Sequence, residues 1–427
     1  MQTPKSFLPR LDRRGFVRVS ALGALSLLIE RAVFPSLATA AEPKAKAPAA
    51  KACIVLWMNG GPSHLDTFDL KPNAKGGGPF KPIKTRAPGV EICQHLPQLA
   101  DKADRLVVCR GMTSGEGNHQ RARYLMHTGY APTPTVTHPS FGSWVSEELS
   151  DSTFELPHFV SINVFNAGGG FLGPQHAPFV VQDPSSMPQN AALPSGVDRA
   201  RLDARTAMLG EMEGDFARMT GDPKVSMRRA VYERSTRLMR SSRLSAFDIA
   251  EEPAAVRAAY GDTDFGRGCL LARRLVEAGV SFVEVVLDGW DTHENGFDRS
   301  KKLMGALDPA MSKLIDDLTA RKMLDRTLVV CMGEFGRTPA INAEQGRDHH
   351  PKAWSAVLAG GGMKKGIAYG QTDENGEKVV KSPVKVPDLF ATMAHLIGLE
   401  PDKLVPTPAG RPIMLTDGGV PVKALMA

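Results

Sequence analysis

Two short β-branched runs in the last third of the chain are each followed directly by a cluster of charged and imidazole-bearing residues. The runs span residues 281–287 and Thr327–Met332, and the clusters span 288–294 and 333–339. Val-rich runs of this length next to glycine are typical of buried parallel strands. In an open α/β sheet, the loops at the carboxyl ends of the strands converge on one crevice. The pattern therefore predicts an active site or metal site assembled from distant parts of the chain.

A third cluster, residues 346–351, lies immediately before another apolar run, Trp354–Ala359, which we also expect to be a buried parallel strand. This cluster contains the adjacent residues His349 and His350. Since neighbouring side chains of an extended segment point in opposite directions, only one of the two can face the crevice. We favour His349.

The order of apolar runs and amphipathic segments predicts an α/β fold. A buried strand over residues 52–58 opens the domain, and helices over 264–278 and 302–322 precede the two later strands. This alternation predicts a doubly wound, mostly parallel sheet flanked by helices. Residues 52–427 are sufficient for one large domain, within which the charged, glycine-poor segment 198–260 is expected to be a helical insert.

The first forty residues have the features of an export signal. Arg13-Arg14 precedes a mildly apolar stretch over 19–29, and Ala38-Thr39-Ala40 provides a small-residue cleavage site. We interpret residues 1–40 as a twin-arginine signal peptide and the Ala/Pro/Lys-rich residues 41–51 as a disordered linker. The expected partner is the twin-arginine export machinery, and the expected location is periplasmic or extracellular. A Sec signal or an uncleaved anchor is the alternative, and no later stretch has the length and apolar character of a membrane span.

The formal charge of +6 is concentrated in this leading segment. Residues 1–40 hold six basic and two acidic residues, so they contribute +4 and leave +2 for the rest. That small charge gives no reason to expect nucleic-acid binding. Five cysteines are too few for a disulfide scaffold, and we expect them to be buried free thiols.

Three motifs, in order along the chain, resemble those of one superfamily. His119-x₃-Arg123-x₄-Thr128-Gly129 has the spacing of the sulfatase nucleophile motif, the run Thr327–Met332 with Gly333-Glu334-Phe335-Gly336 resembles a strand followed by Asp-His-Gly, and the segment 386–398 resembles the closing sulfatase helix. Over nearly all of residues 52–400 the chain thus resembles the alkaline phosphatase and sulfatase superfamily. It most resembles a twin-arginine-exported family of unknown function within it, DUF1501. The resemblance implies that superfamily's α/β fold and an activity on phosphate or sulfate esters.

The chain departs from that superfamily at the residues that carry its chemistry. His119 stands where a sulfatase has its Cys or Ser nucleophile, Asn59-Gly60 replaces tandem aspartates, and Glu334-Phe335 replaces Asp-His. Formylglycine chemistry and the usual two-metal set are therefore not expected. The resemblance therefore implies the fold of the superfamily but not its catalytic mechanism.

The remaining residues still offer a metal site. Mixed imidazole and carboxylate ligands suit zinc or manganese better than calcium. Asp291 and His293, two residues apart in a tight loop, can direct two ligands to one ion. The expected metal ligands are His64, Asp66, Asp291, His293, Glu334 and His349. Arg123 and Arg337 are expected to hold an oxyanion, and His119 to be a nucleophile or a further ligand.

Structural roles compete with each of these assignments. Asp291 and His293 could cap the loop, Glu334 and Arg337 could form a buried ion pair, and Asn118 could simply cap a helix. Arg234, Arg237, Arg240 and Arg243 recur every three residues, and either a solvated helix face or a docking surface for an anionic glycan explains them.

Three functions follow from these alternatives. The first is an exported metal-dependent hydrolase of phosphate or sulfate esters, including those on polysaccharides. The second is a non-catalytic descendant of the fold that serves as a binding or assembly module. The third is metal-independent transfer through His119, which is the least favoured. Whether the protein is an enzyme stays open at the level of sequence.

Overall fold

The computed structural model describes residues 47–427, apart from 152, 164–167, 190, 194 and 223. The predicted signal peptide and residues 41–46 of the predicted linker lie outside the described residues. The end of that linker is not disordered, because Ala50 is buried and its N–H donates to the carbonyl of Leu396. The compact unit accordingly begins at Pro48 and runs to Ala427.

Within the described residues, nine strands form the central sheet, in the order β12-β4-β11-β8-β1-β7-β5-β6 with β15 beside β4. These strands are β1 (Ala52–Asn59), β4 (Leu106–Thr113), β5 (Phe159–Ile162), β6 (Phe179–Val181), β7 (Phe282–Asp288), β8 (Thr327–Met332), β11 (Trp354–Ala359), β12 (Ile367–Tyr369) and β15 (Val384–Lys385). All neighbouring pairs are parallel except β11 with β4 and with β8. The expected mostly parallel α/β sheet is confirmed.

The expectation of a parallel strand at Trp354–Ala359 was wrong, since β11 is antiparallel to both of its neighbours. Two consecutive strands that run parallel in a sheet need a crossover connection between them, usually a helix. Here the chain between β8 and β11 instead forms a short antiparallel hairpin of β9 (Gly336–Arg337) and β10 (His349–His350). The apolar run itself is buried as predicted, but burial does not specify strand direction.

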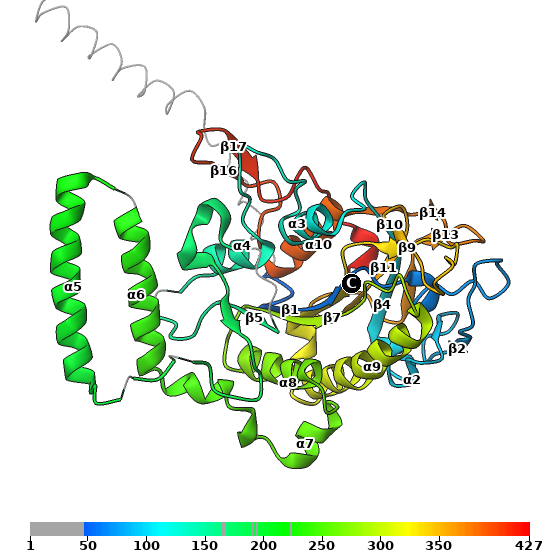
Figure 1. The fold of residues 1–427 in the computed structure, drawn as a ribbon, viewed down its shortest axis with the longest axis horizontal. Coiled ribbons are helices and arrows are strands. Elements are labelled where there is room, and N and C mark those ends of the chain that lie inside the picture. The colour runs from blue at the N-terminus through cyan, green and yellow to red at the C-terminus, as the bar shows by residue number, and fades with distance from the viewer. Residues whose placement is uncertain (1–46, 152, 164–167, 190, 194, 223) are drawn as a thin grey trace, which may run out of the picture. The chain divides into compact units, whose positions relative to one another are not determined.

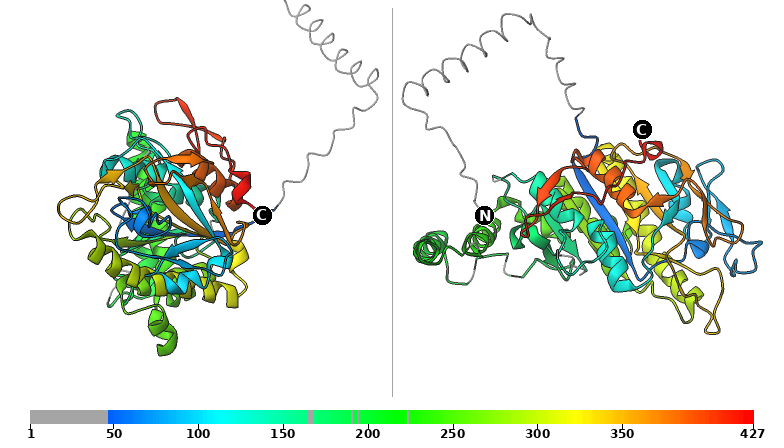
Figure 2. Two further views of the ribbon diagram at one scale, coloured as in Figure 1. Left: turned by 90° about the vertical axis from the view of Figure 1, so that its right-hand side faces the viewer. Right: turned by 90° about the horizontal axis from the view of Figure 1, so that it is seen from above.

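Helices cover both faces of the sheet (Figures 1 and 2). One apolar cluster contains Ile54 and Leu56 of β1 together with α8 (Asp264–Glu277) and α9 (Gly296–Ala320). The other contains Val55 and Trp57 of β1 with α4 (Phe141–Glu148) and α10 (Val386–Ile397). Alternate β1 side chains therefore enter opposite cores, which explains why this strand is apolar at every position from Ala52 to Met58.

Local signals explain where the key helices begin. Asn118 caps α3 (His119–Thr128) by accepting the N–H of Arg121, and Thr263 caps α8 by accepting the N–H of Gly266. Helix α9 begins at Gly296, earlier than the sequence-based boundary of 302. Residues 157–195, which are rich in Gly, Pro, Asn and Gln, contain the short strands β5 and β6.

The predicted insert is helical. It comprises α5 (Arg199–Thr220), α6 (Lys224–Arg240) and α7 (Ala254–Ala259), with short 3₁₀ turns between α6 and α7. Its regularly spaced arginines are used within the protein: Arg234 donates to the carbonyl of Gln175, Arg240 pairs with Asp203, and Arg243 donates to the carbonyl of Ala278. These contacts favour a structural role over a glycan-docking surface.

The remaining described elements are peripheral. They are β2 (Pro82–Lys84), β3 (Glu91–Cys93), α2 (Pro97–Ala100), β13 (Gln371–Thr372), β14 (Val379–Lys381), β16 (Leu404–Pro406) and β17 (Pro412–Met414). The five cysteines are free and buried, as expected. In the part of the chain that the structure describes, no helix combines the length and apolar content needed to cross a membrane.

Candidate metal centre

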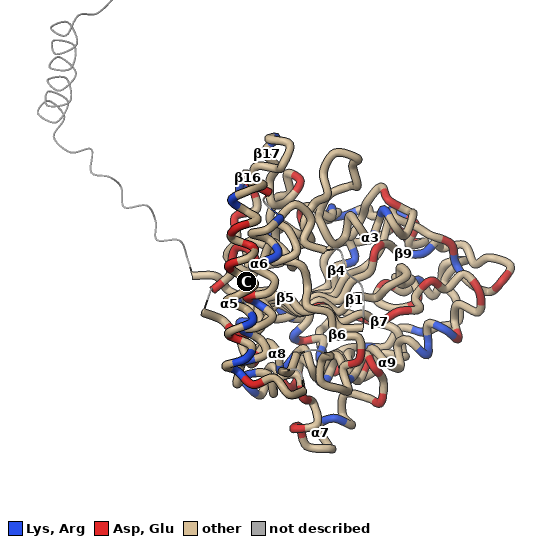
Figure 3. Tube along the Cα trace, turned by 60° about the vertical axis from the view of Figure 1, so that its left-hand side comes forward, with Lys and Arg blue, Asp and Glu red and all other residues tan. Residues whose placement is uncertain are grey.

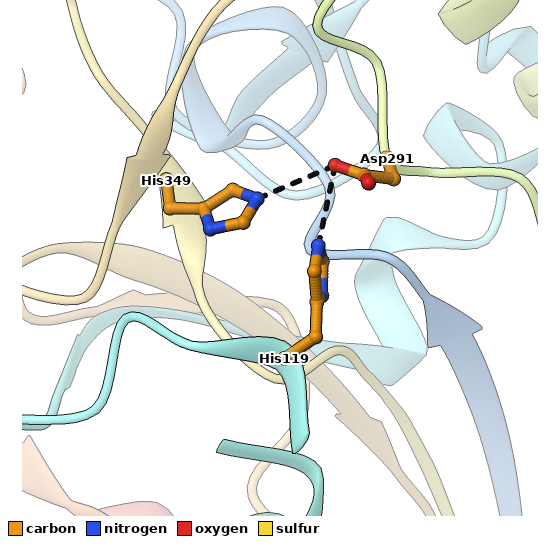
Figure 4. A group of neighbouring side chains, drawn as sticks. All are labelled: His119, Asp291 and His349. Atoms are coloured by element: carbon orange, nitrogen blue, oxygen red, sulfur yellow. Dashed lines mark hydrogen bonds and ion pairs between the residues drawn. The ribbon is translucent and has the colours of Figure 1, made fainter. Parts of the chain in front are cut away.

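Residues from three separate segments meet beyond the carboxyl ends of β7 and β8. His119 is the first residue of α3, Asp291 and His293 lie in the loop after β7, and His349 lies on β10. Figure 4 shows His119 and His349 directed at the carboxylate of Asp291. The convergence expected from the strand-end pattern is therefore present.

Asp291 Oδ1 is the centre of the cluster. It lies 3.2 Å from His119 Nε2, 3.1 Å from His293 Nε2 and 3.4 Å from His349 Nε2. The candidate ligand atoms of His119, Asp291 and His349 all lie within 4.8 Å of one another. Three imidazoles thus present the same ring nitrogen to one carboxylate oxygen.

Each of these rings is oriented by an acceptor on its other nitrogen. His119 Nδ1 lies 2.7 Å from Glu334 Oε1, and His293 Nδ1 lies 3.0 Å from Asp348 Oδ1. His349 Nδ1 lies 2.8 Å from the carbonyl oxygen of Gly117. Because ionised carboxylates and carbonyls only accept, we assign the proton of each neutral ring to Nδ1. The three Nε2 lone pairs then face Asp291, which is the arrangement that metal-binding histidines adopt.

Hydrogen-bond donors meet only part of the cluster. The Nε2 atoms of His293 and His349 lie 2.9 Å apart, and His293 Nε2 also accepts a hydrogen bond from Arg337 Nη1 at 3.2 Å. Within the described residues, His119 Nε2 is buried and makes no hydrogen bond. Burial, and then the charge of Arg337, lower the pKa of His349, which keeps that ring neutral. Three imidazoles and a carboxylate fit a divalent cation such as zinc.

Asp291 stays ionised in this environment. Burial alone would raise its pKa, but the hydrogen bond and charge of Arg337, followed by His119, hold it well below its ordinary value. Arg337 Nη2 donates to Asp291 Oδ1 at 2.6 Å. The carboxylate is therefore available as an anionic ligand at neutral pH.

Arg337 itself is fully buried and its donors are already used. Nε donates to the carbonyl of Gly61 at 2.8 Å. Nη1 donates to the carbonyl of Arg347 at 3.1 Å and to His293 Nε2 at 3.2 Å, and Nη2 donates to the carbonyls of Gly60 and Trp290 as well as to Asp291. The oxyanion-holding role expected of Arg337 therefore does not fit its contacts. It holds together the loops that carry the cluster.

Glu334 lies behind His119 and does not face the other imidazoles. Its two carboxylate oxygens accept the backbone N–H of Gly60 at 3.0 and 3.1 Å, and Oε1 also contacts His119 Nδ1 and Arg123 Nε. A carboxylate that receives these donors orients the histidine, so Glu334 fits a supporting role better than the ligand role expected of it. The alternative of a Glu334–Arg337 ion pair was wrong, because Glu334 pairs with His119 and Arg123.

Arg123 is the guanidinium that remains available. It lies one helical turn after His119, its Nε is 3.3 Å from Glu334 Oε1, and 28% of its side chain is exposed. Among the described residues, its two terminal nitrogens make no hydrogen bond. Both can therefore meet an anion that enters the crevice.

His64 and Asp66 form a separate network. The buried His64 contacts the carbonyl of Gly376 through Nε2 at 2.8 Å, and Asp66 accepts two hydrogen bonds from Arg347 at 2.8 and 3.0 Å. The structure thus places neither residue in the cluster. His350 also points away, with Nε2 2.6 Å from the carbonyl of Glu377, so of the adjacent pair it is His349 that faces the crevice.

Two groups that orient the histidines of the cluster were not predicted from the sequence. Asp348 was part of a recognised cluster but was given no role, and the carbonyl of Gly117 carries no side-chain signal at all. The role of Asp348 could have been predicted, because this acid directly precedes the candidate ligand His349 in the sequence. The second depends entirely on backbone geometry.

The fold and the cluster together define an α/β protein with a histidine-rich candidate metal centre. The chain matches the model of DUF1501, a family described as proteins of unknown function, over residues 50–426, and it belongs to that family. No curated protein was found to match the chain.

Solved structures with a similar arrangement include sulfatases and related proteins. The lipoteichoic acid synthase LtaP from Listeria monocytogenes is 9% identical with a TM-score of 0.37, covering 86% of this chain and 76% of its own. The PsFucS1 sulfatase from Pseudoalteromonas sp. is 13% identical with a TM-score of 0.38, covering 92% and 72%. The phosphonate monoester hydrolase SpPMH from Silicibacter pomeroyi is 12% identical with a TM-score of 0.36, covering 88% and 76%.

Proposed function

We propose that this protein is an exported, metal-dependent hydrolase of phosphate or sulfate esters. The observation that carries the proposal is the convergence of three Nε2 atoms, from His119, His293 and His349, on Asp291 Oδ1. Arg337 Nη1 donates to His293 Nε2, but the lone pairs of His119 and His349 still face the carboxylate oxygen, which is repulsive without a metal ion. A binding site for zinc or manganese removes the repulsion.

The four residues of the cluster would hold the ion, and their supports keep them in place. When bound, a divalent cation acts as a Lewis acid toward an ester oxygen and lowers the pKa of water. Glu334 fixes His119 through Nδ1, and Asp348 does the same for His293. Asp291 is held by Arg337, which also donates to four backbone carbonyls, those of Gly60, Gly61, Trp290 and Arg347.

Arg123 supports an anionic substrate. Its terminal nitrogens can donate two parallel hydrogen bonds to a phosphate or sulfate group, a geometry that a guanidinium matches and an ammonium does not. Glu334 contacts both His119 and Arg123, so the carboxylate that orients one ligand also positions the anion-binding group. Such positive charge against the transferring group is a main requirement of phosphoryl transfer.

A nucleophilic role for His119 is disfavoured. Its Nδ1 is occupied by Glu334, and its Nε2 faces Asp291 rather than an open position. The attacking oxygen would then come from water, since position 119 offers neither a hydroxyl nor a thiol group. Ester groups on polysaccharides are proposed substrates, because an exported hydrolase would meet them.

Metal analysis of the purified protein tests the proposal. About one zinc or manganese ion per chain is expected, with hydrolysis of an aryl phosphate or aryl sulfate that a chelator abolishes. His293→Ala should lose the ion, whereas the matched variant His350→Ala, next to the cluster but outside it, should retain it.

Two results would favour other functions. A folded protein that binds the ion but hydrolyses neither ester would support a binding or assembly module. A folded protein without metal whose His293→Ala variant behaves as the parent would remove the metal centre altogether.

A further inference from the structure

Helix α5 carries an apolar face that nothing in the described chain covers. Met208, Met212, Phe216 and Met219 are 64%, 64%, 54% and 85% exposed. Their spacing of four, four and three residues places them on one side of the helix. No residue of this 22-residue helix is buried. Large apolar side chains grouped on one face are typical of a contact surface.

The opposite face of α5 already has a partner. Asp203 pairs with Arg240 of α6, and Glu213 pairs with Arg228 of α6. Figures 1 and 2 show α6 between α5 and the rest of the domain. The α5–α6 hairpin therefore presents the methionine-rich side of α5 outward, and a long helix held by one polar contact face needs further burial to be stable.

The distribution of charge along α5 indicates which partner would cover this apolar face. Its first half, residues 199–209, carries three arginines and one aspartate, and its second half, 210–220, carries two glutamates, one aspartate and one arginine. The halves thus have net charges of +2 and −2. Both signs are visible along the hairpin in Figure 3. An antiparallel copy of the same helix would place each half opposite its complement.

We propose that α5 is a self-association surface, through which two copies of this chain pair their α5 helices antiparallel. The two α5 helices then lie side by side between the two α6 helices, about a two-fold axis near the middle of α5. Met208 and Met212 of each copy pack across the axis, and Arg205 lies near Asp215 of the other copy. A symmetric contact of this kind is closed, so it gives a dimer and not a fibre.

Sedimentation of the purified protein should show a dimer. Met212→Glu with Phe216→Glu should convert it to a monomer with unchanged metal content, weakening the dimer at least about 100-fold, because it places charge in the centre of the contact. Leu404→Glu, at an apolar side chain that is 60% exposed on β16, is the matched control and should leave the dimer intact. A parent protein that is monomeric at tens of micromolar overturns the proposal.

Cysteine cross-linking tests the direction of pairing. Met212→Cys should form a covalent dimer under mild oxidation, because position 212 lies close to the two-fold axis. Met219→Cys should not, since its two copies would be about 27 Å apart at a rise of 1.5 Å per residue. The natural cysteines are all buried and give little background. Cross-linking at 219 instead of 212 would overturn the antiparallel arrangement.

Charge reversal provides an independent test. Arg205→Glu and Asp215→Arg should each weaken the dimer by several-fold, and the two together should restore it. Lack of restoration would contradict the proposed charge pairing. A monomer that sediments with anionic lipid vesicles through this face would assign it to a membrane surface and overturn self-association.

Discussion

At the scale of single residues, the cluster depends on the groups that hold its histidines. Glu334 makes the most such contacts, since it binds His119, Arg123 and the backbone N–H of Gly60 without exposure to solvent. His293 is oriented by the more exposed Asp348. The two acids therefore perform similar tasks in very different environments, and their removal should have different consequences.

Glu334→Gln is expected to lower the affinity for the metal about 10- to 100-fold, which is the usual effect of losing the partner of a metal-binding histidine. The amide cannot accept equally well from His119 and Arg123, so hydrolysis should fall as well. Competition with a chelator measures the affinity. Asp348→Asn is the comparison, and an equal loss in both variants would contradict the greater importance of the buried acid.

His64 supplies a residue-scale prediction about pH. Burial lowers the pKa of this histidine to about 4 from its ordinary 6.5. Because the unfolded chain takes up the proton first, stability contributed by neutral His64 is complete above pH 6.5 and is lost as the pH falls toward 4. The loss should reach about 3 kcal/mol.

Urea unfolding of the parent and of His64→Gln between pH 7 and pH 4 measures this effect. The variant should be less stable at pH 7 and should show a flatter decline with pH, because it lacks the titrating ring. Parallel curves for the two proteins would show that His64 does not carry this part of the acid sensitivity.

At the scale of elements, the loops after β1 and β7 approach each other too closely for any side chain between them. Gly60 has a φ of +118°, and a Cβ atom there would lie 2.3 Å from the backbone nitrogen of Asp291. The glycine at position 60 thus permits the loop that carries Asp291 to approach the end of β1. This close approach connects the backbone after β1 with the candidate ligand Asp291 in the loop after β7.

Gly60→Ala should therefore displace the loop of Asp291 and reduce metal affinity as well as stability. Gly89→Ala is a matched control, because Gly89 also has a positive φ, of +77°, but has open space around it. The control should lose only about 1 kcal/mol from backbone strain and should keep its metal. Thermal unfolding and metal analysis of both variants separate the two effects.

At the scale of the whole molecule, the protein combines a doubly wound sheet, a histidine-rich cluster at its strand ends and a projecting helical hairpin. The sheet positions the candidate metal centre, and the proposed dimer contact lies on α5, which contributes none of the cluster residues. Separate elements thus carry catalysis and assembly in these two proposals, so either can fail without the other.

The proposed export is also tested at the scale of the whole molecule. Replacing Arg13 and Arg14 by lysine should prevent twin-arginine transport, because that route depends on the paired guanidinium groups, and the precursor should accumulate inside the cell. Fractionation followed by immunodetection measures the outcome. Continued export of the double variant would indicate a Sec signal instead.

The sequence alone was sufficient to predict the family, the mostly parallel sheet, the helical insert and the segments that meet at the strand ends. These follow from local periodicity and from the rule that parallel strand ends converge. Only the tertiary structure decided which candidates face one another. His119, Asp291, His293 and His349 come together, Glu334 and Arg337 support them, and His64 and Asp66 lie elsewhere. The reason is that the direction of a side chain depends on partners distant in the chain, such as the carbonyl of Gly117 that orients His349, and no local pattern encodes them.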